Sequence, residues 1–119
     1  VEDAAPAEQA WELRTETVAV TIAAGRSTEV KASLRAGDEV VYSWTSDNAK
    51  VFFDFHGEPK GGASGEFTSF EKGTLETSSG TFVAPFEGTH GWYWKNKGTG
   101  PTTVTLEATG VYRNLRELR

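Results

Sequence analysis

The stretch Gly88-Thr89-His90-Gly91-Trp92-Tyr93-Trp94-Lys95-Asn96, followed by Thr102-Thr103-Val104-Thr105-Leu106-Glu107-Ala108, decides the fold of this chain. Both runs are rich in the β-branched and aromatic residues that strands favour, and a Lys-Gly-Thr-Gly-Pro turn separates them. They therefore predict two adjacent β-strands. Because side chains alternate between the faces of a strand, one face of the first run is made of His90, Trp92, Trp94 and Asn96. That face either belongs to a core or forms an exposed aromatic platform.

Short alternating runs separated by turn residues continue along most of the chain. In residues 17–22, for example, Val18, Val20 and Ile22 share one face. Turn signals recur roughly every eight to twelve positions, which is typical of a sandwich or barrel. The further strands that we expect are 27–34, 39–45, 50–56, 67–70 and 80–86. We predict an all-β fold, an antiparallel β-sandwich of about eight strands with little helix.

Composition excludes several classes of function. With 12 Lys and Arg against 17 Asp and Glu, the net charge is −5, whereas nucleic-acid binding requires clustered positive charge. The absence of cysteine excludes disulfides, thiolate metal sites and cysteine nucleophiles. No apolar run approaches the roughly 18 residues that a membrane-spanning helix needs. Because the chain has no methionine, we expect it to be a processed or truncated form with any signal or anchor upstream.

The 119 residues predict a single domain with flanking segments. Residues 1–10 are small, acidic and contain a proline, so we expect a flexible linker. Residues 11–112 form the predicted sandwich, with a long loop at Gly57–Gly65 and a polar connection at 71–79. Residues 113–119 are interpreted as a basic C-terminal tail, either a solvated terminus or a contact with a partner or a membrane surface.

Two histidines suggest a metal site as one possibility. His56 and His90 are the only histidines of the chain; Asp54 shares a strand face with His56, and Glu58 follows. Imidazole and carboxylate groups bind Zn²⁺, Cu²⁺ and Ni²⁺, so these four residues form a candidate site if the two strands adjoin. The spacing matches no known metal signature. The alternative is that each histidine makes a structural hydrogen bond at a strand end.

Aromatic residues suggest a ligand platform as a second possibility. The candidate ligand-binding residues are Trp44, Phe52, Trp92 and Trp94, which could stack on a sugar ring or a cation. Aromatic side chains also dominate protein cores, and a small sandwich needs its large residues inside. Phe52 shares its face with Asp54 and His56, so that mixed polar and aromatic face is the better candidate for a site.

Catalytic signatures are absent from the sequence. No spacing pairs two carboxylates across a cleft, as a glycosidase requires, and there is no Gly-x-Ser-x-Gly motif. The run Gly61-Gly62-Ala63-Ser64-Gly65 lacks the Gly-Lys-Ser/Thr ending of a phosphate-binding loop. We therefore expect a protein that is not an enzyme.

Three patches of the sequence resemble small β-sandwich modules of the jelly-roll or GOLD-like kind. The first is Leu-Arg-Ala-Gly-Asp-Glu-Val-Val-Tyr-Ser-Trp at 34–44, and the second is Val-Phe-Phe-Asp-Phe-His-Gly-Glu-Pro at 51–59. The third runs from Gly-Thr-Phe at 80–82 to the Gly-Trp-Tyr-Trp-Lys-Asn segment at 91–96. GOLD-like modules likewise place a Gly-Trp-Tyr strand that ends in Asn before the last long strand.

Over roughly residues 13–112 the chain is also similar to a group of uncharacterised bacterial proteins with an N-terminal membrane anchor and a periplasmic domain. That resemblance implies a domain tethered on the outer face of the inner membrane, and it brings no known activity. We expect a non-catalytic periplasmic or extracytoplasmic binding module, with an unidentified protein or small-ligand partner and contact with the membrane only through the upstream anchor. The alternative is a metal-binding domain for metal resistance or delivery that uses His56 and His90.

Overall fold

The computed structural model describes residues 9–118 and contains eight β-strands and no helix in that range. No helix that could cross a membrane occurs in this part of the chain. The strands are β1 (Glu12–Ile22), β2 (Ser27–Leu34), β3 (Glu39–Ser46), β4 (Val51–Pro59), β5 (Thr68–Leu75), β6 (Thr77–Val83), β7 (Gly88–Lys95) and β8 (Thr102–Leu118). Residues 1–8, most of the predicted linker, lie outside the described range.

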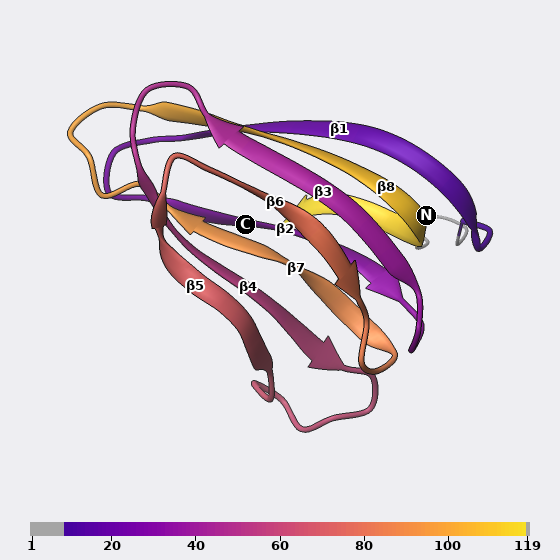
Figure 1. The fold of residues 1–119 in the computed structure, drawn as a ribbon. Helices are drawn as coiled ribbons and strands as arrows, with labels where there is room; N and C mark the ends of the chain where they lie inside the picture. Colours follow the sequence, from indigo (N-terminus) through magenta and orange to yellow (C-terminus); the bar gives the residue numbers. More distant parts are fainter. Residues whose placement is uncertain (1–8, 119) are drawn as a thin grey trace, which may run out of the picture.

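The strands form two layers that face each other. One layer has the order β1-β8-β3-β6 and the other has the order β5-β4-β7-β2, and all pairs are antiparallel. Figure 1 shows the two layers and the long connections that cross between them. This arrangement is the double Greek key of a jelly roll. The predicted antiparallel β-sandwich is therefore confirmed.

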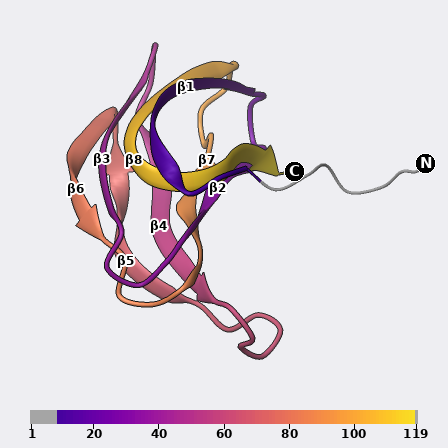
Figure 2. The same ribbon diagram turned by 90° about the vertical axis from the view of Figure 1, so that its right-hand side faces the viewer.

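Strand β8 joins the two layers, which corrects the interpretation of residues 113–118 as part of a tail; Arg119 lies outside the described residues. Up to Tyr112, β8 lies between β1 and β3, and its last residues pair with β2 in the other layer. Asn114 marks the change of direction with a φ of 61°. Leu115 packs against the core, and Thr28 Oγ1 donates a hydrogen bond to Glu117 at 2.6 Å. Figure 2 shows β1 and β8 curving together around this side of the molecule.

The polar stretch 71–79, expected as a connection, instead forms most of β5 and β6. These two strands lie at the outer edges of their sheets, so few of their side chains need to be apolar. Phe70 on β5 and Phe82 on β6 are the ones that pack against the core. The expected loop at Gly57–Gly65 also begins later, because β4 continues to Pro59.

The core between the sheets is aromatic, which corrects the assignment of three tryptophans to a ligand platform. Trp44, Trp92 and Trp94 are only 1%, 4% and 0% exposed. Trp44 packs edge-on against Trp94 with ring centroids 5.8 Å apart, and Trp92 stacks on Phe55 at 4.8 Å. Burial of such large rings is the main source of stability in a small sandwich. These side chains cannot present a surface to a ligand.

The described N-terminal residues are held against the domain. Trp11 lies between the guanidinium groups of Arg35 and Arg113, which are 4.5 and 4.0 Å from its ring centroid. The side-chain oxygen of Gln9 accepts a hydrogen bond from the backbone N–H of Asn114 at 2.9 Å. The first described residues therefore contact the last part of β8.

Candidate functional site on the outer face of the β5-β4-β7-β2 sheet

The outer face of the β5-β4-β7-β2 sheet carries the polar residues that the sequence analysis singled out on β4. Val51, Phe53 and Phe55 point into the core, and the intervening residues therefore point outward. Those outward residues include Asp54, His56 and Glu58. Three of the four predicted metal ligands thus share one face, and Phe52 lies on the same face, as the alternation predicted.

A shallow hollow of about 330 Å³ lies on this face. Four elements line it, namely β2, β4, β7 and the loop that precedes β5. The lining residues are Glu29, Asp54, His56, Glu58, Gly65, Phe67 and Tyr93. Cross-strand pairing explains the grouping, because Tyr93 on β7 is the direct partner of both Glu29 on β2 and Asp54 on β4. We call this feature the outer-face hollow.

An ion-pair network borders the outer-face hollow. Lys31 Nζ contacts Glu58 Oε1 and lies 2.9 Å from Glu29 Oε1, and Thr89 Oγ1 donates to Glu58 at 3.2 Å. Lys31 pairs with Gly91 on β7, where a Cβ would lie 2.0 Å from the carbonyl oxygen of Val30. A glycine is therefore required at this close backbone approach, and no side chain separates Lys31 from Glu58.

The network shifts two pKa values in opposite directions. The hydrogen bond from Lys31 is the main reason that the pKa of Glu58 lies below its usual value. Burial acts to lower the pKa of Lys31, but the hydrogen bonds and charges of Glu29 and Glu58 outweigh it and leave that pKa raised. Both groups are therefore charged at neutral pH, and the network is a fixed feature of the face.

His56 lies at the side of the outer-face hollow and is fixed by its own strand. Its Nδ1 is 3.0 Å from the carbonyl oxygen of Asp54, so Nδ1 carries a proton and donates this bond. The ring of Phe67 packs edge-on against it with centroids 5.5 Å apart. Oδ1 of Asp54 is buried without a hydrogen-bond partner in residues 9–118 and lies 4.0 Å from His56 Nδ1.

His90 lies on the opposite face of the same sheet. It pairs with Gly57, whereas His56 pairs with Gly91, so one histidine points inward and the other outward. Within the described part of the chain, no group of three or more His, Cys, Asp or Glu residues could hold a metal ion. The fourth predicted ligand is thus separated from the other three by the sheet itself.

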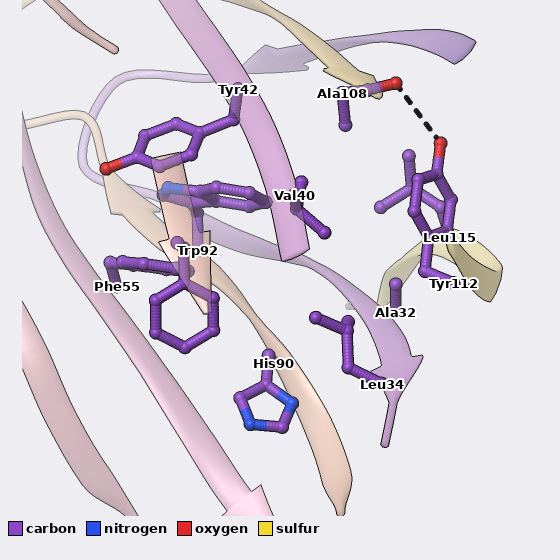
Figure 3. Close-up of a pocket in the computed structure, with 11 residues that line it drawn as sticks. Ala32, Leu34, Val40, Tyr42, Phe55, His90, Trp92, Ala108, Tyr112 and Leu115 are labelled. Atoms are coloured by element: carbon purple, nitrogen blue, oxygen red, sulfur yellow. Dashed lines mark hydrogen bonds between the residues drawn. The ribbon is translucent and has the colours of Figure 1, made fainter. Parts of the chain in front are cut away.

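His90 lines a small cavity inside the sandwich, which Figure 3 shows between the two sheets. The cavity volume is about 20 Å³, which is room for about one water molecule. Phe70, Phe82 and Phe86 surround the imidazole, and its Nδ1 is 3.2 Å from the carbonyl oxygen of Gly88. Its Nε2 is buried and has no hydrogen-bond partner in residues 9–118. Burial lowers the pKa of His90 and keeps the ring neutral at pH 7.

The remaining predicted ligand-binding residue, Phe52, lies near the far end of the outer face. Its ring packs edge-on against Tyr93 with centroids 6.2 Å apart, and Lys97 Nζ lies 5.0 Å above it. Sequence reasoning missed Glu29, Lys31 and Phe67 as parts of this face. Along β2, Glu29 and Lys31 alternate with Val30 and Ala32, which is typical of a strand with one solvated face. Only the pairing of β2 with β7 shows which residues that face meets.

No protein-family model and no curated protein matches this chain. Among solved structures, it is similar to the crystal structure of the Yersinia pseudotuberculosis-derived mitogen, with 15% identity and a TM-score of 0.56 over 81% of this chain and 85% of that one. It also matches the solution NMR structure of a de novo designed double-stranded β-helix, with 16% identity and a TM-score of 0.46 over 78% of this chain and 97% of that one. At such identities the similarity to the mitogen shows only a shared all-β, jelly-roll-like fold.

Proposed function

We propose that this chain is a non-catalytic, extracytoplasmic binding module, tethered to a membrane in the full-length protein, whose ligand binds in the outer-face hollow. The observation that carries the proposal is the position of Phe67. It is 54% exposed, whereas every other aromatic residue of the chain is buried or half-buried. Phe67 lines the outer-face hollow, and aromatic residues are enriched in the surfaces that proteins use for binding.

The loop that carries Phe67 suits this role. It connects β4 to β5 and contains Gly61 and Gly65, both with positive φ, so its backbone adopts turns that other residues resist. Surface loops of this kind commonly carry binding residues on a rigid scaffold. In the structure Phe67 contacts the ring of His56 and lines one side of the hollow.

The charge of the hollow favours an organic cation as the ligand. Glu29, Asp54 and Glu58 supply three carboxylates, and Lys31 neutralises one unit of that charge. The faces of Phe67 and Tyr93 attract an ammonium or guanidinium group, which carboxylates also attract. The ligand class is therefore an amine or guanidinium compound with a small apolar part.

Binding is favoured over catalysis because two of the three carboxylates in the hollow are already engaged in ion pairs. Glu29 and Glu58 both pair with Lys31. A general acid needs a raised pKa, whereas that of Glu58 is lowered. The extracytoplasmic location is supported by the resemblance described in the sequence analysis, and a cysteine-free domain is compatible with it.

The binding proposal is tested by following backbone amide signals during titration with choline, spermidine and arginine amide, and with neutral isosteres as reference. We expect the cations to shift the signals of Asp54, His56 and Tyr93 with a Kd below about 1 mM. Phe67→Ala is expected to weaken binding by about tenfold, a loss of about 1.4 kcal/mol. Leu13→Ala, at a 72% exposed position on β1, is the matched control and leaves binding unchanged.

Absence of binding by all three cations, or shifts confined to another surface, would contradict the assignment of the hollow. The location is tested separately with the full-length protein. A C-terminal fusion to a phosphatase that is active only outside the cytoplasm should be active in cells. An inactive but intact fusion would contradict the extracytoplasmic location and leave the binding result unaffected.

A further inference from the structure

Three strands of the described chain have an open edge, namely β1, β5 and β6. Strands β5 and β6 are consecutive, lie in different layers, and leave the same side of the sandwich open (Figure 1). An open edge presents unpaired N–H and C=O groups to any extended segment. Proteins usually protect such edges with charged residues or proline.

Strand β6 lacks this protection. Strand β1 carries Glu12, Arg14 and Glu16, and β5 carries Glu71 and Lys72. By contrast, β6 has the sequence Thr-Ser-Ser-Gly-Thr-Phe-Val over 77–83, with no charged residue and no proline. Pro85 comes only after the strand has ended. The β6 edge can therefore accept a further strand along its whole length.

The β6 sequence is also compatible with a second copy of itself. In an antiparallel pair centred on Gly80, Ser79 lies opposite the partner's Thr81, and Thr77 lies opposite the partner's Val83. The two side chains of each pair point to the same face of the sheet, as the pleat requires. Pairs of Thr and Ser side chains across neighbouring strands are favourable. Gly80 would lie on the two-fold axis, where the absence of a side chain lets two backbones approach closely.

The surroundings of the edge favour association of two acidic chains. Each copy carries a net charge of −5, so charges at the contact would repel. On the neighbouring strand β3, the outward side chains of Val41, Ser43 and Thr45 are uncharged. Val41 is 54% exposed and Val83 is 56% exposed, so apolar surface lies at the edge. Strand β6, which forms the contact line of the proposed pair, thus carries no charge, while Glu39 of β3 lies beside Val83 at one end of it.

We propose that the chain forms a two-fold symmetric dimer through antiparallel pairing of β6 with β6 of a second copy. The β1-β8-β3-β6 layer then continues into the same layer of the partner as one eight-stranded sheet. Such isologous contacts are the commonest way in which identical chains associate. Because a single strand edge buries little area, the dimer is weak, with a Kd between about 1 μM and 1 mM.

Sedimentation velocity of the chain up to about 1 mM tests the proposal. We expect a concentration-dependent dimer that the double variant Ser79→Lys/Thr81→Lys abolishes, because it opposes lysines across the two-fold axis. Thr105→Lys is the matched control, since Thr105 is exposed on the same face but lies on the central strand β8. This control should dimerise like the parent. Thermal unfolding confirms that each variant is folded.

A cross-linking experiment gives an independent result that does not rely on loss of function. The chain has no cysteine, so Ser79→Cys and Thr81→Cys each introduce a single thiol. Mixing the two variants under mild oxidation should give a disulfide-linked heterodimer, while neither variant alone should cross-link efficiently. A monomer at about 1 mM, a dimer that tolerates the two lysines, or a dimer lost equally in Thr105→Lys would each overturn the proposal.

Discussion

His56 and His90 lie one register position apart on the adjacent strands β4 and β7, yet they face opposite sides of the sheet. His56 pairs with Gly91, and His90 pairs with Gly57. The outward histidine borders a polar hollow, whereas the inward one is enclosed by phenylalanine rings. Two residues that were candidates for one metal site therefore have separate surroundings.

This separation predicts the response to metal ions. One ion cannot contact side chains on both faces of a sheet, so Zn²⁺, Cu²⁺ or Ni²⁺ should give no rise in melting temperature that depends on both histidines. The measurement is thermal unfolding with each ion for the parent, His56→Ala and His90→Ala. A rise that disappears in each single variant would show that our placement of the two rings is wrong.

The buried state of His90 predicts loss of stability in mild acid. Burial, followed by the charge of His56, places the folded-state pKa of His90 below the unfolded value of about 6.5, despite the opposing hydrogen bond to Gly88. As pH falls below about 6.5, the unfolded chain binds a proton that the folded chain does not. The free energy of unfolding then falls by at most about 1.4 kcal/mol per pH unit until the folded pKa is reached.

Urea unfolding between about pH 8 and pH 5 measures this effect. We expect His90→Leu to lose the pH dependence of this window, because it removes the titrating group and leaves an apolar side chain among phenylalanines. His56→Gln is the matched control and should retain most of this pH dependence, because burial is the largest cause of the lowered pKa of His90. An unchanged pH slope in His90→Leu would assign the dependence to another group.

Asn96 is expected to be a larger source of stability than its position at the end of β7 suggests. It is 1% exposed, and its Nδ2 donates to the carbonyl oxygens of Ile22 at 2.9 Å and Gly100 at 2.8 Å. Its Oδ1 accepts from the backbone N–H of Gly98 at 2.9 Å. Asn96→Ala leaves these buried groups unpaired and should cost about 2–4 kcal/mol in urea unfolding.

The matched control for Asn96 is Asn48→Ala. Asn48 is exposed and makes a single bond of 3.2 Å to the carbonyl oxygen of Pro101, so its replacement should cost less than about 1 kcal/mol. Equal losses for the two variants would show that the buried bonds of Asn96 add nothing to stability.

Removal of Lys31 should raise the pKa of Glu58. Lys31→Met keeps the length and apolar stem of the side chain but removes the hydrogen bond that contributes most to the lowered pKa of Glu58. Carboxyl ¹³C shifts followed against pH would report the change. Lys60→Met is the control, because Lys60 is exposed and pairs with Glu87 at 3.4 Å instead. A Glu58 titration that is the same in parent and Lys31→Met would refute the network.

Much of the fold could be predicted from alternation within single strands. The pattern of β3, β4 and β7 separates inward from outward residues correctly, since Trp44, Phe53 and Trp94 are all core residues. The alternation of apolar and polar residues did not predict the full extent of β5 and β6. Both are edge strands with a glycine at an inward position, so their sequences have no regular apolar period. Alternation also did not predict the strand at residues 113–118. These residues pair with β2, which is distant in the sequence.

The sequence by itself determined the fold class and the faces of the strands, because side-chain alternation is a local property of the extended backbone. It also determined the absence of thiol chemistry and an acidic surface, which depend on composition alone. Only the tertiary structure decided which faces meet. The separation of His56 from His90, the contact of Lys31 with Glu58 across Gly91, and the open edge of β6 all depend on strand pairing. Strand pairing is set by the packing of the whole core and cannot be derived from any one segment.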